Sequence, residues 1–191
     1  MFKQHTDTII LIPQHISRNA FVSIQFILLV WYLAYIYEYN RLFYLLSGLY
    51  ISSILHWNRL QYKGIVKTID VVFVNGTFAH VSIFDIHRFM REHWPLWYST
   101  AIVCAIVFVG NEYLFYHQVM KYNNKRVPYT GTYWYFSLDC TNPNTLEREL
   151  AYYRSTITHM IFIHILPTSV CAYCGISAYT QNTGNLNITS I

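Results

Sequence analysis

The side chains from Phe21 to Tyr39 form an apolar run with one amide, Gln25, and no charged group before Glu38. A helix needs about 20 such residues to cross a bilayer. Only helices and closed barrels cross the hydrocarbon layer, because every backbone polar group there needs a partner within the protein. The run therefore predicts a membrane-spanning helix.

Four further apolar stretches of similar length follow along the chain. With the first run they predict spans at about 21–39, 41–57, 68–84, 94–116 and 151–178. Pro167 is expected to bend the last of these, because proline has no backbone donor for the preceding turn. We expect an all-α, polytopic transmembrane bundle that forms one domain over residues 1–191. The number of spans is about five, or six or seven if short helices also cross.

The composition agrees with a membrane protein and excludes some other classes. Hydrophobic residues make up 54% of the chain and charged residues 12%, whereas soluble domains carry about 25% charge. Aromatic residues reach 18%, and Trp and Tyr gather where lipid tails meet headgroups. The net charge of +4 includes no dense Lys/Arg run, so the expected partner is the lipid bilayer and not a nucleic acid. Cys171 and Cys174 have redox or metal spacing, but in an apolar run helix packing is favoured.

Positive charge divides unequally between the two faces of a five-span bundle. The amino end and the connectors after the second and fourth spans hold Lys3, Arg18, Arg59, Lys63, Lys67, Lys121, Lys125, Arg126, Arg148 and Arg154. The other face holds only Arg41, Arg88 and Arg91. Cytoplasmic loops are enriched in Lys and Arg, so we expect the amino end in the cytoplasm and the carboxyl end outside or luminal. The acceptor sequence Asn187-Ile188-Thr189 would then be open to glycosylation.

Polar side chains lie at the ends of three predicted spans. His56 ends the second span, Asp70 begins the third, and His159 and His164 occupy early turns of the fifth. Two crossings separate the end of the second span from the start of the fifth. Because this number is even, all of these side chains reach the same face of the bilayer. Ser52 lies four residues before His56 and therefore shares its helix face.

This set of residues has the chemistry of a divalent metal site. Zinc suits imidazole, and catalytic zinc sites combine three protein ligands with an open position where water becomes a nucleophile near neutral pH. Asp70 could orient a ligand or accept a proton, and the Ser52 hydroxyl could stabilise an oxyanion. His159 and His164 are five residues apart, roughly 140° around an ideal helix. A π-bulge would bring both inward; without one, only one of them can ligate.

The same residues resemble a known group of membrane proteins. Ser52-x-x-x-His56, Asp70 at the start of the next span and a spaced histidine pair on the last span are similar to the superfamily of alkaline ceramidases and adiponectin/progestin receptors (CREST). The resemblance implies zinc bound by His56, His159 and His164, with Ser52 and Asp70 as catalytic residues, and hydrolysis of amide bonds in lipids. That superfamily has seven spans and a His-x-x-x-His pair, so this chain departs from it in both respects.

Three functions are open at this point. The first is a zinc-dependent hydrolase of lipid amides or esters. The second is a non-enzymatic multi-pass membrane protein whose polar residues serve helix packing or partner assembly. In that case His56 would be an interfacial anchor and Asp70 would pair with Lys67. The third is a haem-binding bundle with facing histidines, such as His80, His117 or His164.

Overall fold

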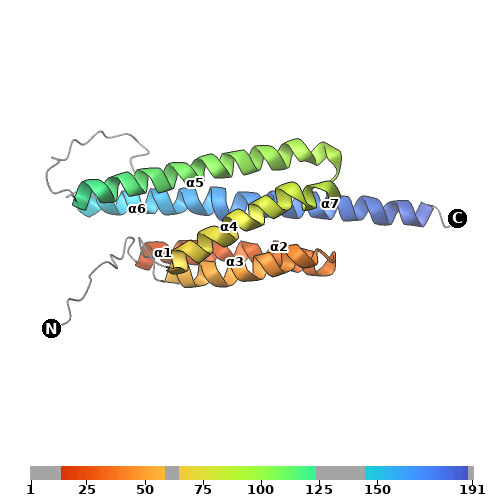
Figure 1. Cartoon of the computed structure of the whole chain (residues 1–191), viewed down its shortest axis with the longest axis horizontal. Helices are drawn as coiled ribbons and strands as arrows, with labels where there is room; N and C mark the ends of the chain where they lie inside the picture. The colour runs from red at the N-terminus through yellow and green to blue at the C-terminus, as the bar shows by residue number, and fades with distance from the viewer. Residues whose placement is uncertain (1–13, 59–64, 124–144, 189–191) are drawn as a thin grey trace.

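The computed structural model describes residues 14–58, 65–123 and 145–188, and this part of the chain is helical without any β-strand. The predicted all-α class is therefore confirmed for these residues. In chain order the elements are α1 (Gln14–Ser23), η1 (Ile24–Phe26), α2 (Ile27–Ile36), α3 (Asn40–Asn58), α4 (Ile65–Ile83), η2 (Asp85–Arg88), η3 (Arg91–His93), α5 (Trp94–Asn123), α6 (Thr145–His159), the π-helix η4 (Met160–Ile165) and α7 (Leu166–Ile188). α1 and α2 pack beside α3, α4 crosses the bundle obliquely, and α5 runs along the continuous α6–α7 rod (Figure 1).

Three helical segments of the described chain are long and apolar enough to cross a membrane. They are His15–Ile36, Arg91–Asn111 and Tyr152–Gln181. The helices α3 and α4, which correspond to the other two predicted spans, have 19 residues each, or about 28 Å of length. Both carry several polar side chains, which lower their mean hydropathy. Membrane-compatible helices are thus present, while the count of five spans stays a prediction.

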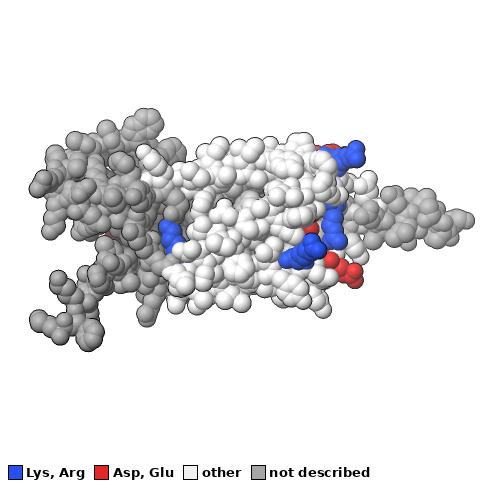
Figure 2. All heavy atoms as spheres, in the orientation of Figure 1, with Lys and Arg blue, Asp and Glu red and all other residues white. Residues whose placement is uncertain are grey.

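The charged side chains of the described residues gather at the ends of the bundle. On the face shown in Figure 2 they lie toward the two ends, and the surface between them is uncharged. Exposed side chains on the outer face of α5 include Ile102, Ile106 and Val109. Charged side chains are costly at the centre of a bilayer, by about 2.5–3.5 kcal/mol on insertion scales. An uncharged apolar belt of this kind suits contact with lipid tails.

The first helix begins earlier than the sequence predicted. It is helical from Gln14, whereas the predicted span begins at residue 21, and it includes the short 3-10 segment η1. Two hydrogen bonds join it to α3: Trp31 Nε1 donates to Ser47 Oγ over 2.8 Å, and the Tyr50 hydroxyl donates to Gln25 Oε1 over 2.9 Å. Polar groups of the first run are therefore satisfied by the neighbouring helix, as a membrane interior requires.

Gly48 marks a close approach between α3 and α4. A Cβ atom built on Gly48 would overlap the ring of Phe73. The absence of a side chain lets that ring lie directly against the α3 backbone, as small residues commonly allow between membrane helices. The result is a tightly packed pair of helices, which brings the polar residues of α3 and α4 together.

The last rod remains continuous through Pro167, where the sequence predicted a bend. Pro167 is the second residue of α7 and directly follows the π-helix η4. Proline provides no N–H for the carbonyl four residues earlier, and the wider π-turn is how this helix accommodates the disruption. The Thr168 hydroxyl bonds to the His164 and Ile165 carbonyls, which satisfies backbone acceptors at this point.

Candidate functional site

A buried carboxylate joins α3 to α4. Asp70 is 7% exposed, and its Oδ1 accepts hydrogen bonds from Ser52 Oγ at 2.9 Å and from Ser53 Oγ at 2.6 Å. The two adjacent serines can reach the same oxygen because α3 and α4 are closely packed at Gly48. Both bonds fall on Oδ1, and no other described residue donates a hydrogen bond to Oδ2, which can therefore act as an acceptor. The sequence had singled out Ser52 and Asp70, and their hydrogen bond joins them directly.

His56 lies one turn beyond Ser52 on the same helix. Its side chain is buried, as is that of Trp57, and the two rings meet edge to face with centroids 5.5 Å apart. Trp57 also contacts both late histidines, with centroid distances of 4.9 Å to His159 and 6.0 Å to His164. The indole is therefore the common neighbour of all three predicted zinc ligands, which the fold brings to one end of the bundle.

The π-helix places His159 and His164 side by side. His159 is the last residue of α6 and His164 lies within η4. In a π-helix, residues five apart are hydrogen-bonded neighbours on successive turns, so the 140° separation of an ideal α-helix does not apply. The ring centroids lie 4.8 Å apart and the ring planes are nearly perpendicular. Two imidazoles bound to one tetrahedral zinc would have centres about 5 Å apart, so this spacing fits a shared ion.

A serine of the first helix fixes the orientation of the His164 ring. Ser23 Oγ lies 2.6 Å from His164 Nδ1, and both residues are buried. The Ser23 hydroxyl also donates to the Ala20 carbonyl at 2.7 Å. Since a hydroxyl has one hydrogen, Nδ1 is the donor toward Ser23 in this arrangement, and Nε2 keeps its lone pair. Metal-binding histidines commonly use the second ring nitrogen in this way.

The third proposed ligand is nearby but not in place. The His56 ring contacts Trp57, the same indole that contacts both late histidines. Yet no three His, Cys, Asp or Glu side chains among the described residues are arranged to hold a metal ion as they stand. Asp70 bonds to serine hydroxyls and not to an imidazole. The donor types suit zinc, and His159 and His164 are the two proposed ligands whose rings contact each other.

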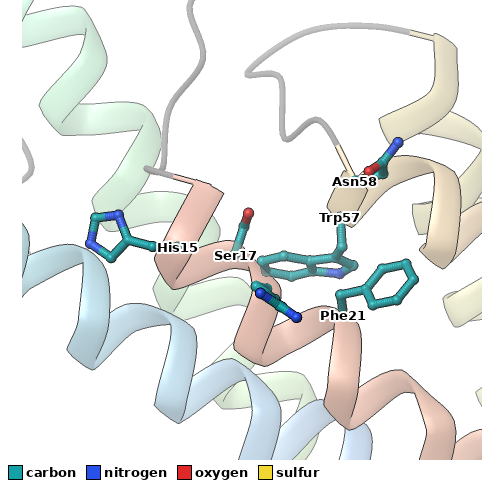
Figure 3. Close-up of a pocket in the computed structure, with 6 residues that line it drawn as sticks. His15, Ser17, Phe21, Trp57 and Asn58 are labelled. Atoms are coloured by element: carbon teal, nitrogen blue, oxygen red, sulfur yellow. The ribbon is translucent and has the colours of Figure 1, made fainter.

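His56, His159 and His164, with Trp57 between them as a common neighbour, form what we call the histidine cluster. An open pocket of about 450 Å³ adjoins this cluster through Trp57. Its lining comprises His15, Ser17, Arg18, Phe21, Trp57 and Asn58. Figure 3 shows the Trp57 indole between Ser17 and Phe21, with Asn58 beyond it. One wall of this pocket is therefore the same indole that contacts His159 and His164.

The remaining histidines lie elsewhere or have other partners. His80 Nε2 is 3.3 Å from Asp85 Oδ2 at the far end of α4, so it faces the connector and not His164. The sequence places His93 in a charged connector and predicts a solvated side chain there, but His93 is buried against Tyr173 with ring centroids 4.9 Å apart. The side chain of His117 lies outside the described residues. These positions give no support to the haem hypothesis.

Cys171 and Cys174 are free and buried in α7, in the surroundings expected of packing residues. Both belong to the hydrophobic core, together with Ala172 and Ile27. This agrees with the preference for packing over redox chemistry at these two positions.

Two contributors to the site were not identified from the sequence. Ser23 is an isolated hydroxyl in an apolar run, and its partner His164 is 141 positions away, so no local pattern indicates the contact. Trp57 follows His56 at the end of a predicted span, where an aromatic residue is expected at the membrane interface. The one available signal was the sequence His56-Trp57, an aromatic residue next to a proposed ligand.

The comparisons with known proteins identify no relative. No protein-family model matches the chain, and neither a curated protein nor a solved structure matches it at a significant level.

Proposed function

We propose that the chain is an integral membrane, zinc-dependent hydrolase of lipid amides or esters. The observation that carries the proposal is the meeting of His159 and His164 at 4.8 Å across a π-helix, with Ser23 on the outer nitrogen of His164. Packing alone does not require a buried imidazole, His164, and a half-buried one, His159, to lie in contact. The CREST resemblance supports the same reading through five residues, but it rests on those positions only.

In the proposed site His56, His159 and His164 hold the zinc ion. The ion would lower the pKa of a bound water and polarise the scissile carbonyl. Ser23 would hold the His164 ring through Nδ1, which leaves Nε2 as the nitrogen available to the ion. Asp70 Oδ2 is the open acceptor that can receive a proton from the attacking water. The Ser52 and Ser53 hydroxyls keep the Asp70 carboxylate in position.

The experiment is hydrolysis of an N-acyl lipid by the purified full chain, with and without a chelator and added zinc. We expect chelation to abolish the activity and zinc to restore it. Asp70→Asn removes the proton acceptor, and general acid–base groups contribute about 10²–10⁴-fold. We therefore expect a loss of at least about 100-fold in kcat. His87→Ala is the matched control, since His87 is an exposed histidine in η2.

Ser52→Ala is a milder variant that keeps the Ser53 bond to Asp70, and it should reduce the rate while the protein stays folded. Hydrolysis that is indifferent to chelation and to Asp70→Asn would contradict the proposal. So would a folded, zinc-treated protein without activity on either lipid amides or esters.

The alternative is a non-enzymatic membrane protein in which these residues serve packing. The observation that favours it is the pair of serine bonds to Asp70, which tie α3 to α4 whether or not chemistry follows. This alternative predicts that substitutions of Ser52, His56 and Asp70 lower the amount of folded protein and its melting temperature. It predicts no zinc-dependent lipid hydrolysis in the wild type or in any of these variants. Comparison of melting with activity in the same variants separates the two functions.

A further inference from the structure

The pocket beside the histidine cluster carries the positive charge of Arg18. Arg18 is exposed and lines the pocket, and no described acidic side chain lines it or pairs with this guanidinium. His15, Ser17 and Asn58 add polar groups to the lining. A guanidinium in such surroundings favours phosphate or carboxylate groups, which it can bind through two parallel hydrogen bonds.

The same pocket has an apolar side. Phe21 and Trp57 contribute two aromatic rings to the lining (Figure 3), and their surfaces suit hydrocarbon. The volume of about 450 Å³ falls within the range of small-molecule sites, roughly 300–1,000 Å³. A ligand that matches both parts has a charged head and an apolar body.

The pocket also has a defined relation to the proposed chemistry. Trp57 lines the pocket and also contacts His159 and His164. α1 supplies Arg18 to the pocket, and its last residue, Ser23, bonds to His164. From Arg18 to Ser23 is five residues, or about 7.5 Å along a helix. A head group on Arg18 would therefore leave the neighbouring bonds of the same molecule close to the histidine pair.

We propose that this pocket binds the anionic, phosphate-bearing head group of a lipid and presents an acyl linkage of that lipid to the histidine cluster. The inference rests on the proposed function for the second half of this statement, and it narrows the substrate class from lipid amides or esters to anionic ones. Recognition of the head group belongs to Arg18, and Phe21 and Trp57 hold the first part of the hydrocarbon.

Binding tests the head-group site without any turnover. The full chain, purified in a neutral detergent and carrying His164→Ala to prevent hydrolysis, is titrated with dihexanoyl phosphatidate, dihexanoylglycerol and inorganic phosphate. We expect the phosphatidate to bind at least about tenfold more tightly than the uncharged lipid, the contribution of one charge-assisted contact. Adding Arg18→Gln should remove that preference, whereas Arg91→Gln, an exposed arginine beyond α4, should leave it unchanged.

Equal affinity for the charged and neutral lipids, or a preference that survives Arg18→Gln, would overturn the inference. Inorganic phosphate that binds as tightly as the phosphatidate would overturn the lipid assignment and leave a free-anion site. Activity measurements distinguish a failure of the head-group inference from a failure of the proposed hydrolase function. Hydrolysis of neutral lipids at the same kcat/KM as anionic ones would reject the inference alone. Charge-dependent binding without zinc-dependent hydrolysis would keep the head-group site and reject the hydrolase.

Discussion

Two buried carboxylates, Asp70 near the start of α4 and Asp85 just after its end, differ in the hydrogen bonds that they receive. Asp70 accepts hydrogen bonds from two serine hydroxyls on Oδ1, so this oxygen has donors within the protein. Asp85 has His80 Nε2 at 3.3 Å, but its Oδ2 makes no hydrogen bond. Burial raises the pKa of Asp85, and the nearby charges of His80, Arg88 and Arg41 oppose that rise only in part.

Replacement of Asp85 by Asn should stabilise the protein at neutral pH. A raised pKa means that the folded state holds the proton more tightly than the unfolded state, whose value is about 3.8. The stabilisation from this proton is complete below that value and is lost as pH rises through the folded pKa. At pH 7 the ionised carboxylate therefore costs stability, which Asn avoids.

Thermal unfolding in detergent from pH 4 to pH 8 measures this effect. The melting temperature of Asp85→Asn should exceed that of the wild type at pH 7, and the difference should shrink toward pH 4. Glu92→Gln is the control, because the Glu92 side chain is 73% exposed. A lower melting temperature for Asp85→Asn at pH 7 would show that the His80 contact outweighs burial.

At the scale of elements, the π-helix and the α2–α3 turn each depart from regular helical geometry. η4 has six residues and contains His164, and it directly follows His159. Glu38, in the turn between α2 and α3, has a φ of 58°, a left-handed conformation that is unfavourable for residues with a Cβ. The first departure brings two proposed ligands together. The second closes a tight connection between neighbouring helices.

The turn gives a simple test of backbone strain. A left-handed residue with a Cβ is disfavoured by about 1–2 kcal/mol, and glycine escapes this cost. Glu38→Gly should therefore be more stable than Glu38→Ala by about 1 kcal/mol, as measured by chemical unfolding in detergent. Both variants remove the same carboxylate, so the comparison isolates the backbone. A Glu38→Ala protein as stable as Glu38→Gly would mean that the turn relaxes to another conformation.

The sequence predicted the helices better than their local geometry. Run length and polar ends located five long helical stretches, because apolar periodicity and chain length are local properties. The start of the first helix at Gln14 was missed, because residues 14–20 are too mixed in polarity to join an apolar run. A π-bulge between His159 and His164 was considered only because the five-residue spacing required one. The sequence alone does not show whether a helix widens, since that depends on Pro167 and on packing against neighbouring helices.

At the scale of the molecule, the meeting of α3, α4 and α6–η4 follows from the direction in which each helix runs. An even number of helices lies between the end of α3 and the start of α6, so Trp57 and His159 come to the same end of the bundle. The number of intervening helices determines at which end of the bundle a residue lies, but it does not determine how each helix is rotated about its axis. The Ser23 contact and the incomplete approach of His56 depend on those rotations, which is why sequence reasoning did not reach them.

Metal analysis of the purified protein tests the central claim most directly. X-ray absorption of the zinc-reconstituted full chain should show one zinc per chain with nitrogen ligands at about 2.0–2.1 Å. His164→Ala should lose that ion, and His87→Ala, at an exposed histidine outside the cluster, should keep it. A folded wild-type protein that takes up no zinc, or a His164→Ala protein with an unchanged spectrum, would contradict the account.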